Sequence, residues 1–446
     1  MEYSIFKYLH FSRPTSEQEV VLKAMEEFVH PENPDDFLIL CGAAGTGKTS
    51  ITSALVGYLN SIGKSYRIAA PTGRAARIIG RKAKVTTSTI HSLIYIPKTD
   101  SASGKVEFKL KQGYDSSPAI YLIDEASMIP KNKDNTSSLF ESEEGLLLDL
   151  VKYIKTAHVE NKVIFLGDQY QLAPINEAHS YALQKDFIEK TFNFSGESYL
   201  LTEVKRQEDG SYILENATDI RKAIDRGETS HGIQGNSNEN IYEAAKKFAK
   251  EQKSDGLENS VAIGVSHKAN KFFNDLVRKE VFGYAKKIIE PGDLMMVTQN
   301  WYREGQQLFN GDHVEILSVD WGLQEEVAGL HFVAAKIRVL FSEEEMEVED
   351  YILLESITTI GGKVDPAKDK ALRKQRYVKN PIFRDSEKPG DDRYLGALRL
   401  MYGNAITCNK AQGGEWNKVF INTMGIPTLK WQYTAVTRGV KDIEKF

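Results

Sequence analysis

The first half of the chain repeats one arrangement of apolar and polar positions. Short apolar runs are each followed by a polar or glycine-containing cluster and then by a stretch with helical spacing; they lie at 37–41, 67–70, 120–123 and 163–166. The arrangement continues after further runs at 199–201, 261–265 and 419–422. Short apolar runs of this kind are typical of buried parallel strands, whose carboxyl ends meet at one edge of a sheet. We therefore expect an α/β protein with two parallel-sheet domains.

Two segments interrupt this arrangement. Residues 94–119 are polar and rich in turn residues, and their central part, 105–111, alternates strictly between polar and apolar side chains, which predicts a small β-hairpin. Residues 313–395 change to short alternating strands, followed by a basic stretch from Lys363 to Lys379. We expect a compact β-barrel there, inserted into the second α/β domain.

Length, charge and cysteine content narrow the class of protein. A chain of 446 residues is too long for one core, so about two to four domains are expected. The net charge of -5 argues against a protein that coats nucleic acid through bulk positive charge, so any nucleic-acid site must be a local groove. Cys41 and Cys408 have no CxxC partner, which predicts buried, reduced thiols. The sequence has neither a secretory signal nor an apolar run of about 18 residues, so we expect a cytoplasmic location without a membrane span.

A glycine-rich loop follows the first apolar run. It reads Gly42-Ala43-Ala44-Gly45-Thr46-Gly47-Lys48-Thr49, and Ser50 continues into a helical stretch. In a GxxxxGK[ST] loop the backbone N–H groups turn inward around a polyanion, the lysine reaches the outer phosphates and the hydroxyl binds Mg²⁺. A chance match in an ordinary turn is the alternative, but the strand before and the helix after favour a phosphate loop. The loop predicts a nucleoside triphosphate as ligand.

Two later strand ends carry groups suited to phosphate hydrolysis. Asp124 and Glu125 follow the run 120–123; Asp124 would join Thr49 at Mg²⁺, and Glu125 would orient and deprotonate the attacking water. Gln171 lies in the loop after 163–166, where its amide would bond the γ-phosphate or its water. Solvated turns and helix caps are the alternative roles. The position of both groups after a phosphate loop favours catalysis.

Arginine and glutamine side chains supply further candidates. Arg206 and Arg438 each follow apolar strand or helix material of the second α/β domain, and a guanidinium there would stabilise the charge that develops on the transferred phosphate. Ordinary surface arginines are the alternative. For Gln18 two interpretations stay open: its amide reads an adenine edge, or it closes a capping box with Thr15.

Two histidines and one basic stretch are candidates for nucleic-acid contact. His91 and His267 lie near strand or helix ends beside hydroxyl side chains, which suits contact with phosphates or stacking on single-stranded bases. Structural histidines are the alternative, and neither residue has metal-ligand spacing. The stretch from Lys363 to Lys379 would track a phosphate backbone or form a solvated face.

The order of these motifs resembles the superfamily 1 helicases of the RecD-like branch, which includes the petite-integration-frequency (PIF) helicases and a phage relative. Each motif alone is a weak signal, whereas the ordered set is highly specific. The matching segments are Gln18, 42–49, 69–76, 89–92, 124–127, 167–174, 201–207, 310–312, 407–415 and 433–439, and together they span nearly the whole chain.

The resemblance implies a domain organisation and a set of site residues. It implies two RecA-like domains, 1A at 1–195 with a wedge or pin insert 1B at 94–119, and 2A at 196–312 and 396–446 with an SH3-like insert 2B at 313–395. ATP would lie between the RecA-like domains and single-stranded DNA across their tops. The implied catalytic residues are Lys48, Asp124, Glu125, Gln171 and the trigger arginines Arg206 and Arg438; the ATP-binding residues are Gln18, Gly42 to Ser50 and Glu415; and the DNA-binding residues are Pro71, Thr72, Arg74, His91, His267, Thr407 and Lys410.

The expected function is therefore an ATP-dependent DNA helicase that moves 5′ to 3′. The resemblance implies ATP and Mg²⁺ as cofactors, single-stranded and tailed duplex DNA as partners, a monomeric motor, and family roles in replication, repair, telomere maintenance and G-quadruplex unwinding. Three alternatives stay open: an ATP-controlled switch that binds single-stranded DNA without separating strands, a motor on RNA, and a small-molecule kinase that shares only the phosphate loop.

Overall fold

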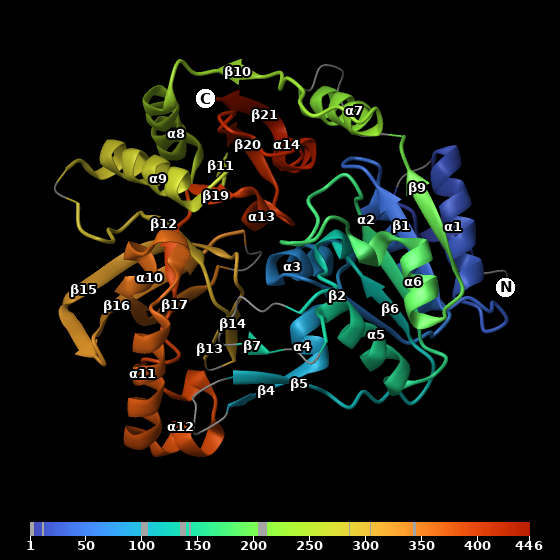
Figure 1. The fold of residues 1–446 in the computed structure, drawn as a ribbon, viewed down its shortest axis with the longest axis horizontal. Helices are drawn as coiled ribbons and strands as arrows, with labels where there is room; N and C mark the ends of the chain where they lie inside the picture. Colours follow the sequence, from blue (N-terminus) through green and yellow to red (C-terminus); the bar gives the residue numbers. More distant parts are fainter. Residues whose placement is uncertain are drawn as a thin grey trace. The chain divides into compact units, whose positions relative to one another are not determined.

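The computed structural model describes residues 4–10, 13–99, 106–133, 140–141, 144–203, 212–284, 286–303, 305–341 and 345–446. The chain forms two compact units, shown in Figure 1. The first comprises residues 1–98 and 106–209, and the second comprises 99–105 and 210–446. No helix among the described residues is both long enough and apolar enough to cross a bilayer.

The first unit is built on a six-stranded parallel sheet with the order β3-β2-β6-β8-β1-β9. Its strands are β1 (Phe37–Gly42), β2 (Tyr66–Ala70), β3 (Ser88–Thr89), β6 (Ile120–Ile123), β8 (Lys162–Gly167) and β9 (Gly196–Leu201). The four apolar runs of the first half therefore all form neighbouring strands of one sheet, as expected. Strand β9 corrects the predicted boundary at 195, because it pairs in parallel with β1 and belongs to the first sheet.

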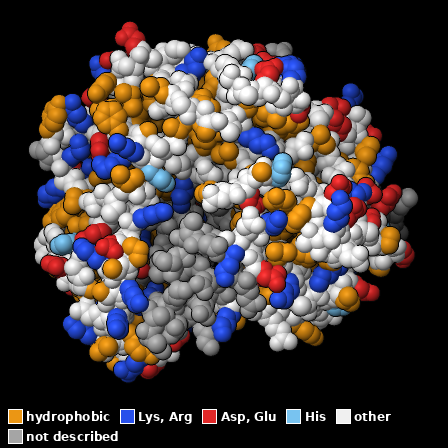
Figure 2. All heavy atoms as spheres, viewed as in Figure 1, with side chains coloured by type: hydrophobic (Ala, Val, Ile, Leu, Met, Phe, Trp, Pro, Cys, Tyr) orange, Lys and Arg blue, Asp and Glu red, His pale blue; other side chains and the backbone are white. Residues whose placement is uncertain are grey.

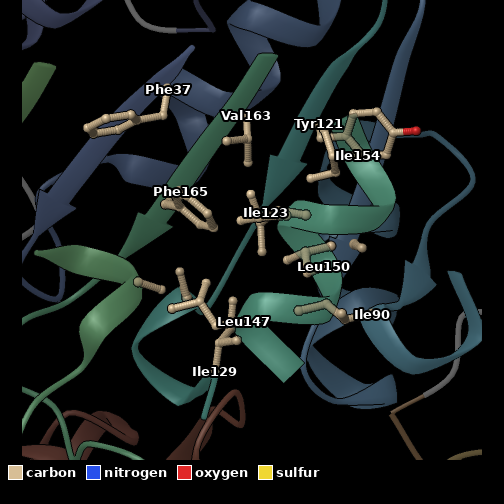
Figure 3. Packing of buried hydrophobic residues seen from close by; sticks show 14 of the residues in the cluster. Phe37, Ile90, Tyr121, Ile123, Ile129, Leu147, Leu150, Ile154, Val163 and Phe165 are labelled. Carbon is tan, nitrogen blue, oxygen red and sulfur yellow. The ribbon is translucent and has the colours of Figure 1, made fainter. Parts of the chain in front are cut away.

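Both faces of this sheet are covered by helices. The helices of the unit are α1 (Ser16–Phe28), α2 (Lys48–Ser61), α3 (Gly73–Ala83), α4 (Ile90–Ile94), α5 (Leu146–Ala157) and α6 (Lys185–Phe192), with short 3-10 helices η1 (Ile5–Tyr8), η2 (Ala126–Met128) and η3 (Tyr181–Leu183). Alternate side chains of β1 divide between two cores, as the period of a strand requires. Phe37 belongs to the cluster shown in Figure 3, which also contains Phe165 and the α5 residues Leu147 and Leu150. Leu38 packs on the other face, against α1 and α2.

A small sheet accompanies the predicted hairpin. Strands β4 (Tyr95–Thr99) and β5 (Val106–Leu110) are neighbours, and β7 (Phe140–Glu141) pairs in parallel with β5. The alternating segment 105–111 thus forms a strand from Val106 to Leu110. Strand β7 extends the sheet beyond the predicted range of 94–119.

The second unit contains a five-stranded parallel sheet with the order β10-β21-β20-β11-β19. Its strands are β10 (Asn236–Ser237), β11 (Ser260–Gly264), β19 (Ala405–Thr407), β20 (Trp416–Ile421) and β21 (Gly439–Lys445), and its helices are α7 (Tyr212–Asp225), α8 (Ile241–Asp255), α9 (His267–Phe282), α13 (Cys408–Ala411) and α14 (Leu429–Val436). Phe248, Phe273 and Phe420 form the centre of a core that joins α8 and α9 to the sheet.

A five-stranded antiparallel sheet interrupts this parallel sheet in sequence, with the order β17-β16-β15-β12-β18. The strands are β12 (Leu294–Val297), β15 (His313–Val327), β16 (Leu330–Val339), β17 (Glu347–Leu353) and β18 (Leu400–Tyr402), with a separate hairpin of β13 (Trp301–Arg303) and β14 (Gln306–Leu308). The sheet includes strands outside the predicted insert at 313–395, because β12 pairs with β15 on one side and with the edge strand β18 on the other. Leu398 bridges Ile352 of β17, so the chain entering β18 also meets the opposite edge strand.

The basic stretch is helical. Between β17 and β18 lie α10 (Leu354–Thr358), α11 (Pro366–Lys379) and α12 (Pro381–Ser386), with η4 (Ile360–Gly362) and η5 (Pro389–Asp391). Proline at the first position of α11 and of α12, with Asp365 and Asn380 as the caps, explains where each helix begins.

Candidate nucleotide site and nucleic-acid contacts

The phosphate loop joins β1 to α2. Gly45 and Gly47 have φ angles of 81° and 88°, a conformation that favours glycine, so the loop requires glycine at both positions. Helix α2 begins at Lys48, and its N-cap, Gly47, offers no side-chain hydrogen bond to the first-turn N–H groups. Such a helix N-terminus is a ready-made site for phosphate oxygens.

Lys48 lies against its own loop. Its Nζ donates to the backbone oxygen of Gly42 and, at 3.1 Å, to that of Ala43. The Thr46 hydroxyl also donates to the Ala43 oxygen, at 2.8 Å. These bonds hold the ammonium beside the turn into which a triphosphate would fit.

Asp124 and Glu125 follow β6, which is separated from β1 by β8. The Asp124 N–H donates to the Ala69 oxygen at 2.9 Å, which fixes the start of the turn. Burial raises the pKa of Asp124, while the positive charge of Lys48 opposes that rise, so the carboxyl lies within electrostatic reach of the phosphate loop. Glu125 has a φ of 50°, a left-handed conformation that costs a non-glycine residue about 1–2 kcal/mol. The turn after β6 therefore holds strain at the residue predicted to be the catalytic base.

The loop after β8 is ordered by Asp168. Its Oδ1 accepts the Tyr170 N–H at 3.0 Å, and its backbone oxygen accepts the Gln171 N–H at 3.2 Å. Gln171 is buried, yet its Oε1 has no hydrogen-bond partner among the described residues. A buried amide oxygen without a partner is unusual and is open to a donor such as water.

Cys41 lies at the end of β1, close to the charged groups of this edge. Burial, reinforced by the negative charge of Asp168, raises the pKa of its thiol to about 12, and Lys48 opposes the shift. Both cysteines are buried and free, as predicted from the absence of a CxxC pair.

Gln18 connects α1 to the phosphate loop. Its Oε1 accepts the Thr15 N–H at 3.0 Å while Thr15 Oγ1 accepts the Gln18 N–H at 3.1 Å, which completes the predicted capping box. Its Nε2 donates to the Thr46 backbone oxygen at 2.9 Å. A Cβ on Gly47 would lie 2.7 Å from the same Nε2. The structure thus assigns Gln18 a structural role in the loop, and adenine contact stays a prediction.

Four predicted DNA contacts of the first unit follow two neighbouring strands. Ala70 of β2 and Thr89 of β3 are paired in register, so the turns that follow them share one edge of the sheet. Thr72 caps α3 by accepting the Ala75 N–H at 3.2 Å, and Thr89 caps α4 by accepting the Ser92 N–H at 3.1 Å. The residues brought to this edge are Pro71, Thr72, Arg74 and His91, of which Arg74 is buried and His91 exposed.

The other three predicted DNA contacts, His267, Thr407 and Lys410, follow two neighbouring strands of the second unit. Gly264 of β11 is paired with Thr407 of β19, so α9, which starts at His267, and α13, which carries Lys410, follow adjacent strand ends. Lys410 Nζ donates to Asn310 Oδ1 at 2.8 Å. Burial and the positive charges of Lys410 and Lys363 lower the pKa of His267. Burial likewise lowers the pKa of Lys410.

Sequence reasoning did not single out Asn310 and Lys363 as members of this group. The only signals were the match at 310–312 and the position of Lys363 at the start of the basic stretch. Neither signal indicates that Asn310 bonds Lys410 or that Lys363 lies near His267, although Gly361, two residues before Lys363, lies against the histidine ring.

Of the two candidate trigger arginines, only Arg438 lies among the residues that the structure describes. Arg206 lies outside the described residues. Arg438 is buried, and its guanidinium bonds within the second unit: Nε to the Thr434 oxygen at 3.1 Å and Nη1 to the Gly414 oxygen at 3.2 Å. It therefore lies beside the 407–415 motif, whose last residue, Glu415, is exposed.

Comparisons with known proteins agree with these motifs. A family model described as an AAA domain matches residues 22–245, and one described as a UvrD-like helicase C-terminal domain matches 402–442. The chain is 26% identical over 472 residues to the ATP-dependent DNA helicase dda of Enterobacteria phage T4, covering 95% of this chain and 96% of that protein. It is 27% identical over 139 residues to the ATP-dependent RecD2 DNA helicase of Deinococcus radiodurans, a match that covers 31% of this chain and 16% of that protein.

Solved structures show the same fold. Pif1 helicase from Candida albicans matches with a TM-score of 0.53 at 15% identity, covering 98% of this chain and 94% of that one. Pif1 helicase from Bacteroides, in complex with ADP-AlF3 and single-stranded DNA, matches with a TM-score of 0.51 at 15% identity, covering 98% and 92%. Because the AAA-domain model covers half of the chain, the chain belongs to that family, and its fold is that of the Pif1-like superfamily 1 helicases.

Proposed function

We propose that this chain is an ATP-dependent DNA helicase that moves 5′ to 3′ on single-stranded DNA and separates tailed duplexes. The observation that carries the proposal is the convergence of the phosphate loop, Asp124-Glu125 and the Gln171 loop on the carboxyl edge of one parallel sheet. The named activity of the phage T4 relative, which matches over almost its full length, supports the same conclusion.

Each of the grouped side chains has a role in ATP hydrolysis. Lys48 leaves its loop carbonyls to meet the outer phosphates, which offer it stronger, charge-assisted hydrogen bonds. Glu125 accepts a proton from the attacking water, and the unpartnered Oε1 of Gln171 accepts a hydrogen bond from the same water. Gln18 keeps the loop in the shape that receives the phosphates.

Magnesium fits the donor set of the loop and the strand end. The Thr49 hydroxyl and the Asp124 carboxylate are the hard oxygen ligands that Mg²⁺ prefers, and the positive charge of Lys48 opposes the rise that burial causes in the pKa of Asp124. When bound with ATP, the metal neutralises charge on the phosphate oxygens.

In this proposal Arg438 links the second unit to hydrolysis, and Arg206 acts with it. Arg438 and Arg206 would direct guanidinium groups at the γ-phosphate, where they stabilise the spread of negative charge in the transition state. For Arg438 this requires exchange of its bonds to Gly414 and Thr434 for bonds to phosphate. Glu415, next to Gly414, would contact the nucleotide sugar.

The residues gathered at the two strand edges would hold single-stranded DNA through its backbone. In this proposal the β4-β5-β7 sheet acts as the wedge, and the antiparallel sheet acts as the SH3-like insert; the bridge between Leu398 and Ile352 supports a sheet that curls toward closure. A monomeric motor and G-quadruplex unwinding remain predictions from the resemblance, and a cytoplasmic location remains a prediction from the sequence pattern.

Strand displacement tests the proposal. Duplexes with a 5′ tail, a 3′ tail or blunt ends are compared in the presence of ATP, and unwinding of the 5′-tailed duplex alone is expected. DNA-stimulated ATP hydrolysis without displacement of any duplex would instead identify an ATP-controlled switch.

A further inference from the structure

One face of α11 anchors the helix to the second unit. Leu372 is fully buried, and Asp369 accepts a hydrogen bond from Arg399. Arg376 Nε donates to Asp392 Oδ2 at 2.7 Å, an ion pair whose carboxylate is buried. These residues follow the spacing of one helical face, so the helix has a fixed rotation about its axis.

The opposite face carries exposed lysines. Lys370 and Lys374 are one turn apart on that face, and Lys379 ends the helix; all three are exposed. None of the three has an ion pair or a hydrogen bond among the described residues, in contrast to Lys368, which donates to the Gly329 oxygen at 2.9 Å. Figure 2 shows Lys and Arg side chains at the lower left of the view, where Figure 1 places α11 and α12.

This concentration of positive charge is local. Residues 363–388 contain nine Lys and Arg against four Asp and Glu, whereas the chain as a whole has a net charge of -5. Two of the acids are already used, because Asp369 pairs with Arg399 and Asp365 caps the helix through the Ala367 N–H. Like charges four residues apart destabilise a helix by about 0.2–0.5 kcal/mol, so the lysine face lowers the stability of the isolated helix.

The lysine face begins beside the nucleic-acid group of the second unit. Lys363 precedes α11 and lies close enough to His267 for its charge to contribute to the lowered pKa of that histidine. The positive surface therefore extends from Thr407, Lys410 and His267 through Lys363 to α11.

We propose that the lysine face of α11 binds the phosphate backbone of double-stranded DNA, next to the single strand that the motor holds. The exposed side chains of α11 include no aromatic ring, and single-stranded DNA sites combine positive charge with aromatic stacking surfaces. A helix of 14 residues is about 21 Å long and rigid, which suits contact with successive phosphates of a stiff duplex. The inference rests on the proposed action on DNA and adds a second, duplex-specific contact surface to it.

The test compares two triple variants with equal changes in net charge. K370Q/K374Q/K379Q removes the two lysines of that face together with the exposed lysine that ends the helix, and K246Q/K250Q/K253Q removes three exposed lysines of α8 in the same unit. Binding of a blunt duplex and of a single-stranded oligonucleotide is measured by fluorescence anisotropy over a series of salt concentrations. The slope of log affinity against log salt reports the number of phosphate contacts, at about 0.9 per contact for duplex DNA.

The α11 variant should reduce the duplex slope by about 2–3, while its single-strand affinity and its ATP hydrolysis stimulated by single strands stay at the wild-type level. The α8 variant should match wild type in all three measurements. An unchanged duplex slope in the α11 variant, or an equal loss in the α8 variant, would overturn the inference. If single-stranded DNA does not stimulate ATP hydrolysis by the wild-type protein, that result would instead count against the proposed function.

Discussion

Replacing Gln18 with alanine removes a side chain that ties α1 to the phosphate loop. The substitution breaks the bond from Gln18 Nε2 to the Thr46 oxygen and the bond from the Thr15 N–H to Gln18 Oε1. Gln18 is 2% exposed and Thr46 is fully buried, so water does not readily replace either bond in the intact structure.

The expected loss of stability follows from those two groups. A buried donor or acceptor left without a partner costs about 1–3 kcal/mol, and relaxation around the shortened side chain recovers part of this. We therefore expect the free energy of unfolding of the first unit to fall by about 2–4 kcal/mol. Because the loop that receives the phosphates loses its support, the KM for every nucleoside triphosphate should rise.

The assay pairs urea unfolding with the kinetics of ATP and GTP hydrolysis in the presence of single-stranded DNA. Lys23→Ala, at an exposed position of the same helix, is the control and should leave both measurements near wild type. A structural role for Gln18 predicts reduced stability and an unchanged ratio of ATP to GTP specificity. Unchanged stability together with a selective loss of ATP over GTP would refute this reasoning and would establish adenine contact instead.

Four further predictions concern single residues. Glu125→Gln should retain ATP binding, measured by equilibrium dialysis, and lose turnover; normal hydrolysis by this variant would remove Glu125 from its assigned role. Glu125→Gly should unfold at a higher urea concentration than Glu125→Ala, because glycine adopts the φ of 50° more readily than alanine. Gly47→Ala should weaken binding of a fluorescent ATP analogue at least tenfold, since its Cβ would displace Gln18 Nε2; wild-type affinity would contradict the loop geometry. Arg438→Lys should lower kcat on the order of 10³-fold with little change in KM, and a rise in KM at constant kcat would contradict its assignment to the transition state. Single-strand affinity should increase from about pH 8 to about pH 6, because bound phosphate favours protonation of His267, whose pKa is lowered in the free protein. His267→Gln should reduce this increase, and an equal increase in both proteins would exclude His267.

Four strands of the first sheet, β1, β2, β6 and β8, were predictable because each contains an apolar run. The run at 120–123 is β6 to the residue, and the runs at 37–41 and 163–166 differ from β1 and β8 by one or two residues. Strand β9 was assigned to the wrong domain because its own residues do not record its partner. Its place is decided by pairing with β1, which is distant in sequence.

The sequence pattern also did not show where the antiparallel-sheet insert begins and ends. Strands β12 and β18 have four and three residues and are separated by about a hundred positions, so their pairing leaves no local periodicity. Within the candidate site, the phosphate loop was predictable from its motif, and the capping box was predictable from Thr15 and Gln18. The bond from Gln18 to Thr46, the approach of Lys363 to His267 and the inward position of Arg438 depend on tertiary packing.

The central claim is that ATP hydrolysis by this chain drives movement along single-stranded DNA in one direction. The most direct measurement is the ATP-dependent displacement of streptavidin from biotin placed at either end of a single-stranded oligonucleotide, with Glu125→Gln as the inactive control. The proposal predicts rapid displacement from the 3′ end, slow displacement from the 5′ end and none by the control. Equal rates at both ends, or displacement by the Glu125→Gln variant, would contradict it.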